Sequence, residues 1–113
     1  MPPLSAGAES APLVNGPARP AQEAARLTAW LHGRVQGVGM RWWIRSRALE
    51  RGLAGWARNT DDRRVEVVAE GPRAAAEALL EALRNAPDRP GQVTAVTERW
   101  SEAAGALSGF EER

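Results

Sequence analysis

Four stretches of the chain alternate apolar residues with polar or mixed ones, which is the pattern of half-buried strands. The first is RLTAWLHGR, residues 26–34. GWARNTDDRRVEVVAEG, residues 55–71, predicts two strands joined by a turn at a pair of aspartates. VTAVTERW, residues 93–100, predicts a fourth strand, and a short last strand is expected around Phe110. The alternation in the fourth strand groups Val93, Ala95 and Thr97 on one face.

Two other stretches have helical spacing. RWWIRSRALERG, residues 41–52, predicts a helix with Gly52 as its C-terminal cap. A second helix is predicted to open at Gly71-Pro72, with the proline at the first helical position. Its apolar residues recur at spacings of three and four, at Ala76, Leu79, Leu80 and Leu83. The order β-α-β-β-α-β predicts an α+β, ferredoxin-like sandwich, with one antiparallel sheet and two helices on one of its faces.

The N-terminal residues have a different composition. Five of the eight prolines fall within residues 1–25, with alanine, glycine and serine between them. Such a stretch cannot bury enough apolar surface to offset the entropy lost on ordering. We therefore predict a disordered tail over residues 1–25 and a single domain over residues 26–113.

The residue inventory of the 113-residue chain excludes several chemistries. All fifteen basic residues are arginine, cysteine is absent, and His32 is the one histidine. There is thus no thiolate nucleophile, Schiff-base lysine, cysteine-ligated zinc or disulfide. The net charge of +1 does not indicate a nucleic-acid or membrane partner. Without an apolar run of membrane-spanning length or a signal pattern, the expected location is cytoplasmic.

The most informative segment is GRVQGVGMR, residues 33–41, which leaves a strand and enters a helix. Its three glycines let the backbone turn tightly, so that successive N–H groups can face one anion. The helix adds the positive end of its dipole, and Arg41 in its first turn can fork onto two phosphate oxygens. The spacing matches neither a Walker A loop nor a dinucleotide fingerprint. Glycine spacing alone leaves an ordinary strand-to-helix turn equally open.

Here the sequence resembles the acylphosphatase family. GRVQGVGMR is similar to that family's phosphate loop, whose usual form is GRVQGVGFR. GLAGWARN, residues 52–59, resembles its second signature, G-L-x-G-W-V-R-N, at the family's spacing from the loop. VEVVAEGP, residues 65–72, and SGFE, residues 108–111, are shorter matches. The resemblance covers the chain from Arg26 to its C-terminus.

The resemblance implies an enzyme that hydrolyses the carboxyl-phosphate bond of small acyl phosphates to carboxylate and inorganic phosphate. Arg41 would bind the phosphate, and Asn59 would hold the attacking water. The backbone N–H groups of the loop would cradle the phosphoryl oxygens, at Gln36, Gly37, Val38, Gly39 and Met40. No metal and no cofactor are implied. We expect a monomer that acts on small molecules, without nucleic-acid or membrane partners.

The sequence departs from the family pattern at two core positions. Met40 replaces the usual aromatic residue before the arginine, and Ala57 stands where valine is common. Methionine fills irregular core space readily, so we expect an effect on stability more than on catalysis.

Other interpretations rest on weaker signals. A non-catalytic phosphate-, anion- or RNA-binding module on the same fold is the alternative, although the five tryptophans are too scattered to predict a base-stacking platform. Glu66 and Glu70 share a strand face, and a solvated sheet edge explains them better than a catalytic carboxylate pair. His32 has no carboxylate near it in sequence and receives no catalytic role.

Overall fold

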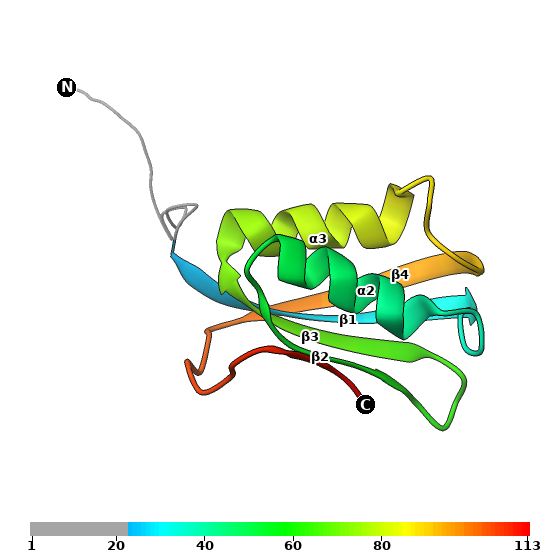
Figure 1. The fold of residues 1–113 in the computed structure, drawn as a ribbon, viewed down its shortest axis with the longest axis horizontal. Coiled ribbons are helices and arrows are strands. Elements are labelled where there is room, and N and C mark those ends of the chain that lie inside the picture. Colours follow the sequence, from blue (N-terminus) through cyan, green and yellow to red (C-terminus); the bar gives the residue numbers. More distant parts are fainter. Residues whose placement is uncertain (1–22) are drawn as a thin grey trace.

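The structure, a computed structural model, describes residues 23–113 and contains five strands and two helices (Figure 1). The elements follow one another in the order β1 (Ala24–Arg34), α2 (Met40–Glu50), β2 (Ala54–Asn59), β3 (Val65–Pro72), α3 (Arg73–Asn85), β4 (Gln92–Ser101) and β5 (Phe110–Glu112). This is the predicted β-α-β-β-α-β order, followed by the short last strand. Neither helix in the described part of the chain is long and apolar enough to cross a membrane.

The five strands form one sheet in the order β4-β1-β3-β2-β5. Strands β1, β2, β3 and β4 pair antiparallel, whereas β5 runs parallel to β2. Both helices lie on the same face of the sheet (Figure 1). The ferredoxin-like fold is confirmed, with its four main strands antiparallel, and the short β5 adds a parallel pairing at the β2 edge. The chain crosses from the β4 edge to the opposite edge before it forms β5, and this return sets the parallel direction.

The core lies between the helices and the inner face of the sheet. The apolar stripe predicted for α3 is buried there, against the alternating apolar residues of β1 and β3. The largest fully buried side chains come from all of these elements, from α2 and from the loop that follows β1: Leu27, Leu31, Val35, Met40, Ile44, Val65, Val67, Leu79 and Leu83. Burying one such side chain contributes about 1.5–3 kcal/mol, so these contacts set how the helices lie on the sheet.

Two element boundaries differ slightly from the sequence prediction. Strand β1 begins at Ala24, and Ala25 is buried, so the domain starts two residues before Arg26. The predicted tail otherwise falls on residues 1–22, which lie outside the described residues. Pro72 precedes α3 in an extended conformation and is its N-cap instead of its first helical residue. Gly52 has a φ of 70° and follows α2 as the predicted C-terminal glycine.

An irregularity in β4 breaks the alternation that its sequence predicts. His32 of β1 pairs with Ala95, but the next residue, Gly33, pairs with Val93, so Thr94 is an extra residue in β4. Val93 and Val96 therefore both pack against the core. The predicted grouping of Val93, Ala95 and Thr97 on one face was wrong, because a bulge shifts the side-chain period by one residue.

Candidate active site

The segment between β1 and α2 is shaped by glycines with left-handed backbone angles. Gly37 has a φ of 73° and Gly39 a φ of 84°, values that other residues adopt at a cost. Gly39 is the N-cap of α2, and its carbonyl accepts the first helical hydrogen bond from the Trp43 N–H at 3.0 Å. Glycine has no side chain to cap the helix, and no residue in the first turn is acidic. The free N–H groups and the helix dipole therefore favour an anion at this end of α2.

A small cavity of about 80 Å³ opens beside this loop. Residues from the loop, the first turn of α2, the end of β2 and β5 line it: Val35, Gly37, Gly39, Met40, Arg41, Trp42, Asn59 and Glu112. Arg41 and Asn59, eighteen positions apart in the chain, thus meet at one cavity with the loop glycines. Gln36 and Val38, which the sequence also assigns to the loop, are not among the residues that line it.

Arg41 projects from the first turn of α2. Its Nη1 donates a hydrogen bond of 2.6 Å to the main-chain oxygen of Arg113. An arginine has five N–H donors, so this contact orients the guanidinium and leaves other donors for an anion. Because β5 pairs with β2, the last residues of the chain are held next to the cavity.

Asn59 is the last residue of β2 and is exposed. Its position is fixed by pairing with Val65 across the β2–β3 hairpin. Within residues 23–113 its side-chain amide takes part in no hydrogen bond, so the amide is available to a water molecule or a substrate.

A side-chain contact that the sequence did not predict links the loop to this hairpin. Nε2 of Gln36 donates to the carbonyl oxygens of Thr60 and Arg64, at 2.9 and 2.8 Å. Thr60 in turn closes the hairpin, because its N–H donates to the Arg64 carbonyl and its hydroxyl accepts the Arg64 N–H. Gln36 therefore holds the glycine loop against Thr60, the residue that follows Asn59. The motif pointed only to the backbone N–H of Gln36.

Charges in the hairpin are balanced locally. The Arg64 guanidinium, 2.8 Å from Asp62, and the Thr60 hydroxyl lower the pKa of Asp62 to about 2. Asp62 is thus ionised at any physiological pH and neutralises Arg64. It cannot act as a general acid, which needs a raised pKa.

Glu66 and Glu70 do not form a catalytic pair. Strand β3 lies in the middle of the sheet, so the expectation of a sheet edge was wrong, and each carboxylate is held by its own arginine. Burial opposes ionisation of Glu70, but the Ala104 and Gly105 N–H groups and Arg26, at 2.5 Å, outweigh it and keep the pKa below its ordinary value. The pKa of Glu66 is also lowered, because its bonds to Arg58 and Trp30 outweigh burial.

Two of the five tryptophans share the sheet face opposite the helices. The register places Trp30 beside Glu66, and Trp56 beside Val68 two residues further along β3. Arginines of the same chain cover both rings: Arg64 lies 5.9 Å from the Trp30 ring centre, and Arg113 lies 4.1 Å from that of Trp56. Each of the two rings therefore has an arginine of the same chain near one of its faces.

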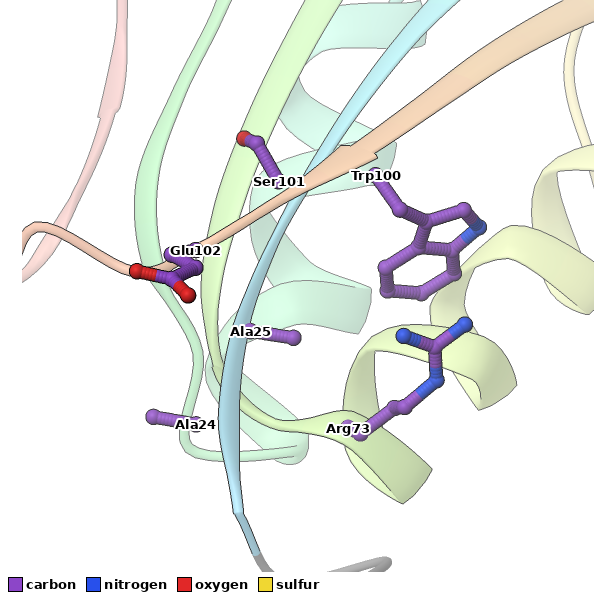
Figure 2. A pocket seen from close by; sticks show the side chains of 6 residues that line it. All are labelled: Ala24, Ala25, Arg73, Trp100, Ser101 and Glu102. Atoms are coloured by element: carbon purple, nitrogen blue, oxygen red, sulfur yellow. The ribbon is translucent and has the colours of Figure 1, made fainter. Parts of the chain in front are cut away.

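A second cavity, of about 190 Å³, lies where α3 begins (Figure 2). Ala24, Ala25, Arg73, Trp100, Ser101 and Glu102 line it. The Arg73 guanidinium lies over the Trp100 ring, 4.2 Å from its centre, and also pairs with Glu77 at 3.0 Å. None of the sequence-predicted site residues lines this cavity. No group of three His, Cys, Asp or Glu side chains suited to a metal ion occurs among residues 23–113.

A glycine loop at a helix N-terminus, an arginine and a free amide around one small cavity form a site suited to a phosphoryl group. Fold and site together define a class: small ferredoxin-like proteins that handle phosphoryl groups. A family model for acylphosphatase matches residues 27–112. The chain belongs to the acylphosphatase family.

Individual relatives agree with this assignment. The acylphosphatase of Saccharopolyspora erythraea is 68% identical over 89 residues, which cover 79% of this chain and 93% of the relative. The acylphosphatase of Thermobifida fusca is 62% identical over 91 residues, covering 80% and 99%. The crystal structure of acylphosphatase from Bacillus subtilis is similar, with a TM-score of 0.72 at 37% identity, and covers 79% of this chain and 98% of that one.

Proposed function

We propose that this protein hydrolyses acyl phosphates to a carboxylate and inorganic phosphate. The observation that carries the proposal is the single cavity at which the glycine loop, Arg41 and Asn59 meet. The loop N–H groups of residues 36–40 and the Arg41 guanidinium bind the phosphoryl oxygens. Asn59 holds the attacking water through its side-chain amide.

In the reaction, the water oxygen forms a bond to phosphorus while the bond from phosphorus to the carboxylate oxygen breaks. The electron pair of the broken bond leaves with the carboxylate, which needs no proton at neutral pH. A phosphate oxygen takes the proton of the water, so a general base is not required. Phosphoryl transfer depends mainly on positioning and charge stabilisation, which the loop and Arg41 supply.

The proposal includes catalysis without a metal or cofactor. Because the roles of the loop, Arg41 and Asn59 need no metal ligand, we expect full activity after exhaustive treatment with a chelator. Activity that disappears with chelation and returns with added metal would contradict this mechanism. The same proposal describes a cytoplasmic monomer with a small-molecule substrate and no nucleic-acid partner. Sedimentation with and without RNA tests the monomeric state and the absence of a nucleic-acid partner.

Substitution of the two polar residues separates their roles. Asn59→Ala should leave inhibition by inorganic phosphate nearly unchanged while kcat falls about 10²–10³-fold, the usual cost of losing a donor at a developing charge. Arg41→Ala should weaken both phosphate binding and turnover. Arg41→Lys should restore little, because a point charge cannot make the forked contact.

Matched controls are available on exposed positions away from the cavity. Asn85→Ala at the end of α3 and Arg99→Ala in β4 remove the same groups and should leave the kinetics unchanged. A folded Asn59→Ala protein with normal turnover would remove Asn59 from the mechanism. A wild-type protein that binds phosphate but turns over no acyl phosphate would instead favour the non-catalytic binding module.

A further inference from the structure

The cavity has one exposed apolar side chain at its rim. Trp42 is 61% exposed, whereas the other apolar side chains that line the cavity, Val35 and Met40, are buried. Within residues 23–113 the Trp42 indole takes part in no hydrogen bond, ion pair or ring contact. An exposed indole beside a polar site is costly in water, and it can gain contacts when a ligand covers it.

The backbone directs this indole toward the site. Trp42 is the third residue of α2, and side chains in the first turn of a helix lean toward its N-terminus. The loop residues there, Gly37 and Gly39, have no side chains, and nothing lies within 4 Å of where their Cβ atoms would be. Trp42 thus presents a large apolar surface next to the side of the cavity that Gly37 and Gly39 leave open.

The size of the cavity determines which part of a substrate meets Trp42. At about 80 Å³ it is far smaller than the roughly 300–1,000 Å³ pockets that enclose drug-sized ligands. With the phosphoryl group bound to the loop and Arg41, the acyl group must lie outside the cavity, at its rim.

We propose that the acyl group lies on the Trp42 indole and that the enzyme prefers acyl phosphates with an aromatic or large apolar acyl group. This inference rests on the proposed function, because it assigns the non-reacting part of the same substrate. Stacked aromatic groups gain free energy beyond the area that they bury.

Glu112 narrows the substrate class further. It lines the same cavity from β5, and its exposed carboxylate takes part in no hydrogen bond or ion pair among residues 23–113. A negative charge at the rim repels an acyl group that itself ends in a carboxylate or phosphate. The preferred acyl group is therefore uncharged as well as apolar.

A basic cavity on another side of the loop would instead favour substrates with a negatively charged acyl group. This cavity, of about 310 Å³, is lined by Gly33, Arg34, Val35, Gln36 and Arg63, and it includes neither Arg41 nor Asn59. It shares only the buried Val35 with the cavity at the loop. An acyl group that extends from Arg41 toward Trp42 does not enter this basic cavity. A substrate with a negatively charged acyl group therefore tests the two cavities against each other.

The test compares benzoyl phosphate with acetyl phosphate in wild type, Trp42→Phe and Trp42→Ala. For Trp42→Ala we expect kcat/KM to fall about tenfold with benzoyl phosphate, mainly through KM, and less than about twofold with acetyl phosphate. Trp42→Phe keeps an aromatic face and should retain most of the difference. Leu49→Ala, at a 44% exposed position of the same helix, is the control and should change neither value.

Three outcomes would overturn the inference while leaving the proposed function intact. One is an equal loss with both substrates in Trp42→Ala, and another is no loss with either. The third is faster wild-type hydrolysis of an acyl phosphate whose acyl group carries a carboxylate, reduced by Arg34→Ala. If the wild type hydrolyses none of these substrates, the proposed function fails and the inference fails with it.

Discussion

The Gln36 side chain offers a sharp test of how the site is held in place. Substitution Gln36→Met keeps nearly the same length and volume and removes both hydrogen bonds from Nε2 to the hairpin carbonyls. Because the change conserves volume, it opens no cavity and forces no overpacking. The change in the free energy of unfolding then measures the two hydrogen bonds, and the change in kcat measures the position that they maintain.

The structure sets the size of the effect. The Thr60 carbonyl also accepts the Arg63 N–H at 3.2 Å, and the Arg64 carbonyl also accepts the Thr60 N–H at 2.9 Å. Neither oxygen is left without a partner, so the penalty for an orphaned polar group does not apply. Two ordinary hydrogen bonds contribute about 1–3 kcal/mol to the free energy of unfolding, and we expect a loss near the lower end of that range. The melting temperature should fall by about 4–8 °C for each kcal/mol.

The catalytic effect should exceed what this stability loss explains. Releasing the loop from the hairpin lets Asn59 move relative to the bound phosphoryl group, and a displacement of about 1 Å can cost about 10² in rate. Urea unfolding followed by tryptophan fluorescence gives the free energy, and steady-state kinetics well below the melting temperature give kcat. Gln92→Met, at an exposed glutamine of β4, is the matched control. Reduced stability with an unchanged kcat would refute the positioning role and leave Gln36 a purely structural residue.

Three further predictions follow from the fold. Glu70→Gln should lower the free energy of unfolding by about 2 kcal/mol at neutral pH. Because the folded-state pKa of Glu70 is lowered, this difference from wild type should shrink as the pH falls below about 4. Urea titrations at several pH values measure it. Gly55→Ala should cost about 3 kcal/mol or more, since its Cβ would lie 1.8 Å from the Val68 carbonyl oxygen, whereas Gly105→Ala, with open space around it, should cost about 1–2 kcal/mol. Deleting residues 2–22 should leave kcat/KM and the melting temperature nearly unchanged, and a large drop in either would show that this segment contributes to the domain.

Local pattern was sufficient to predict the elements and their order. Alternating apolar residues in β1 and β3 predict one buried face of the sheet, and the apolar spacing in α3 predicts one buried face of the helix. The structure packs these faces against each other. The loop glycines and Arg41 could be proposed as site residues from the sequence, because backbone conformation and anion binding both restrict residue type within a few positions.

Features that depend on distant pairing could not be predicted. The bulge at Thr94 arises from where β4 pairs with Gly33, and the direction of β5 arises from its pairing with β2. The Gln36 contacts join residues 24 and 28 positions apart, and nothing in the local sequence distinguishes a glutamine that bridges from one that is solvated. Glu112 reaches the cavity because β5 pairs with β2, the strand that ends at Asn59, and nothing in the local sequence signals that pairing.

The close contacts around Gly33 and Gly91 limit how the glycine loop of residues 33–41 could be transplanted. A Cβ at Gly33 would lie 2.3 Å from the Gln92 carbonyl oxygen, and a Cβ at Gly91 would lie 2.3 Å from that of Arg34. The base of the loop is thus shaped by a glycine more than fifty residues away, in the turn before β4. A protein engineer who grafts residues 33–41 onto another ferredoxin-like scaffold must also supply a glycine in that turn and two hairpin carbonyls for Gln36. The transferable unit is three segments of chain in a fixed arrangement, and the nine-residue motif by itself is insufficient.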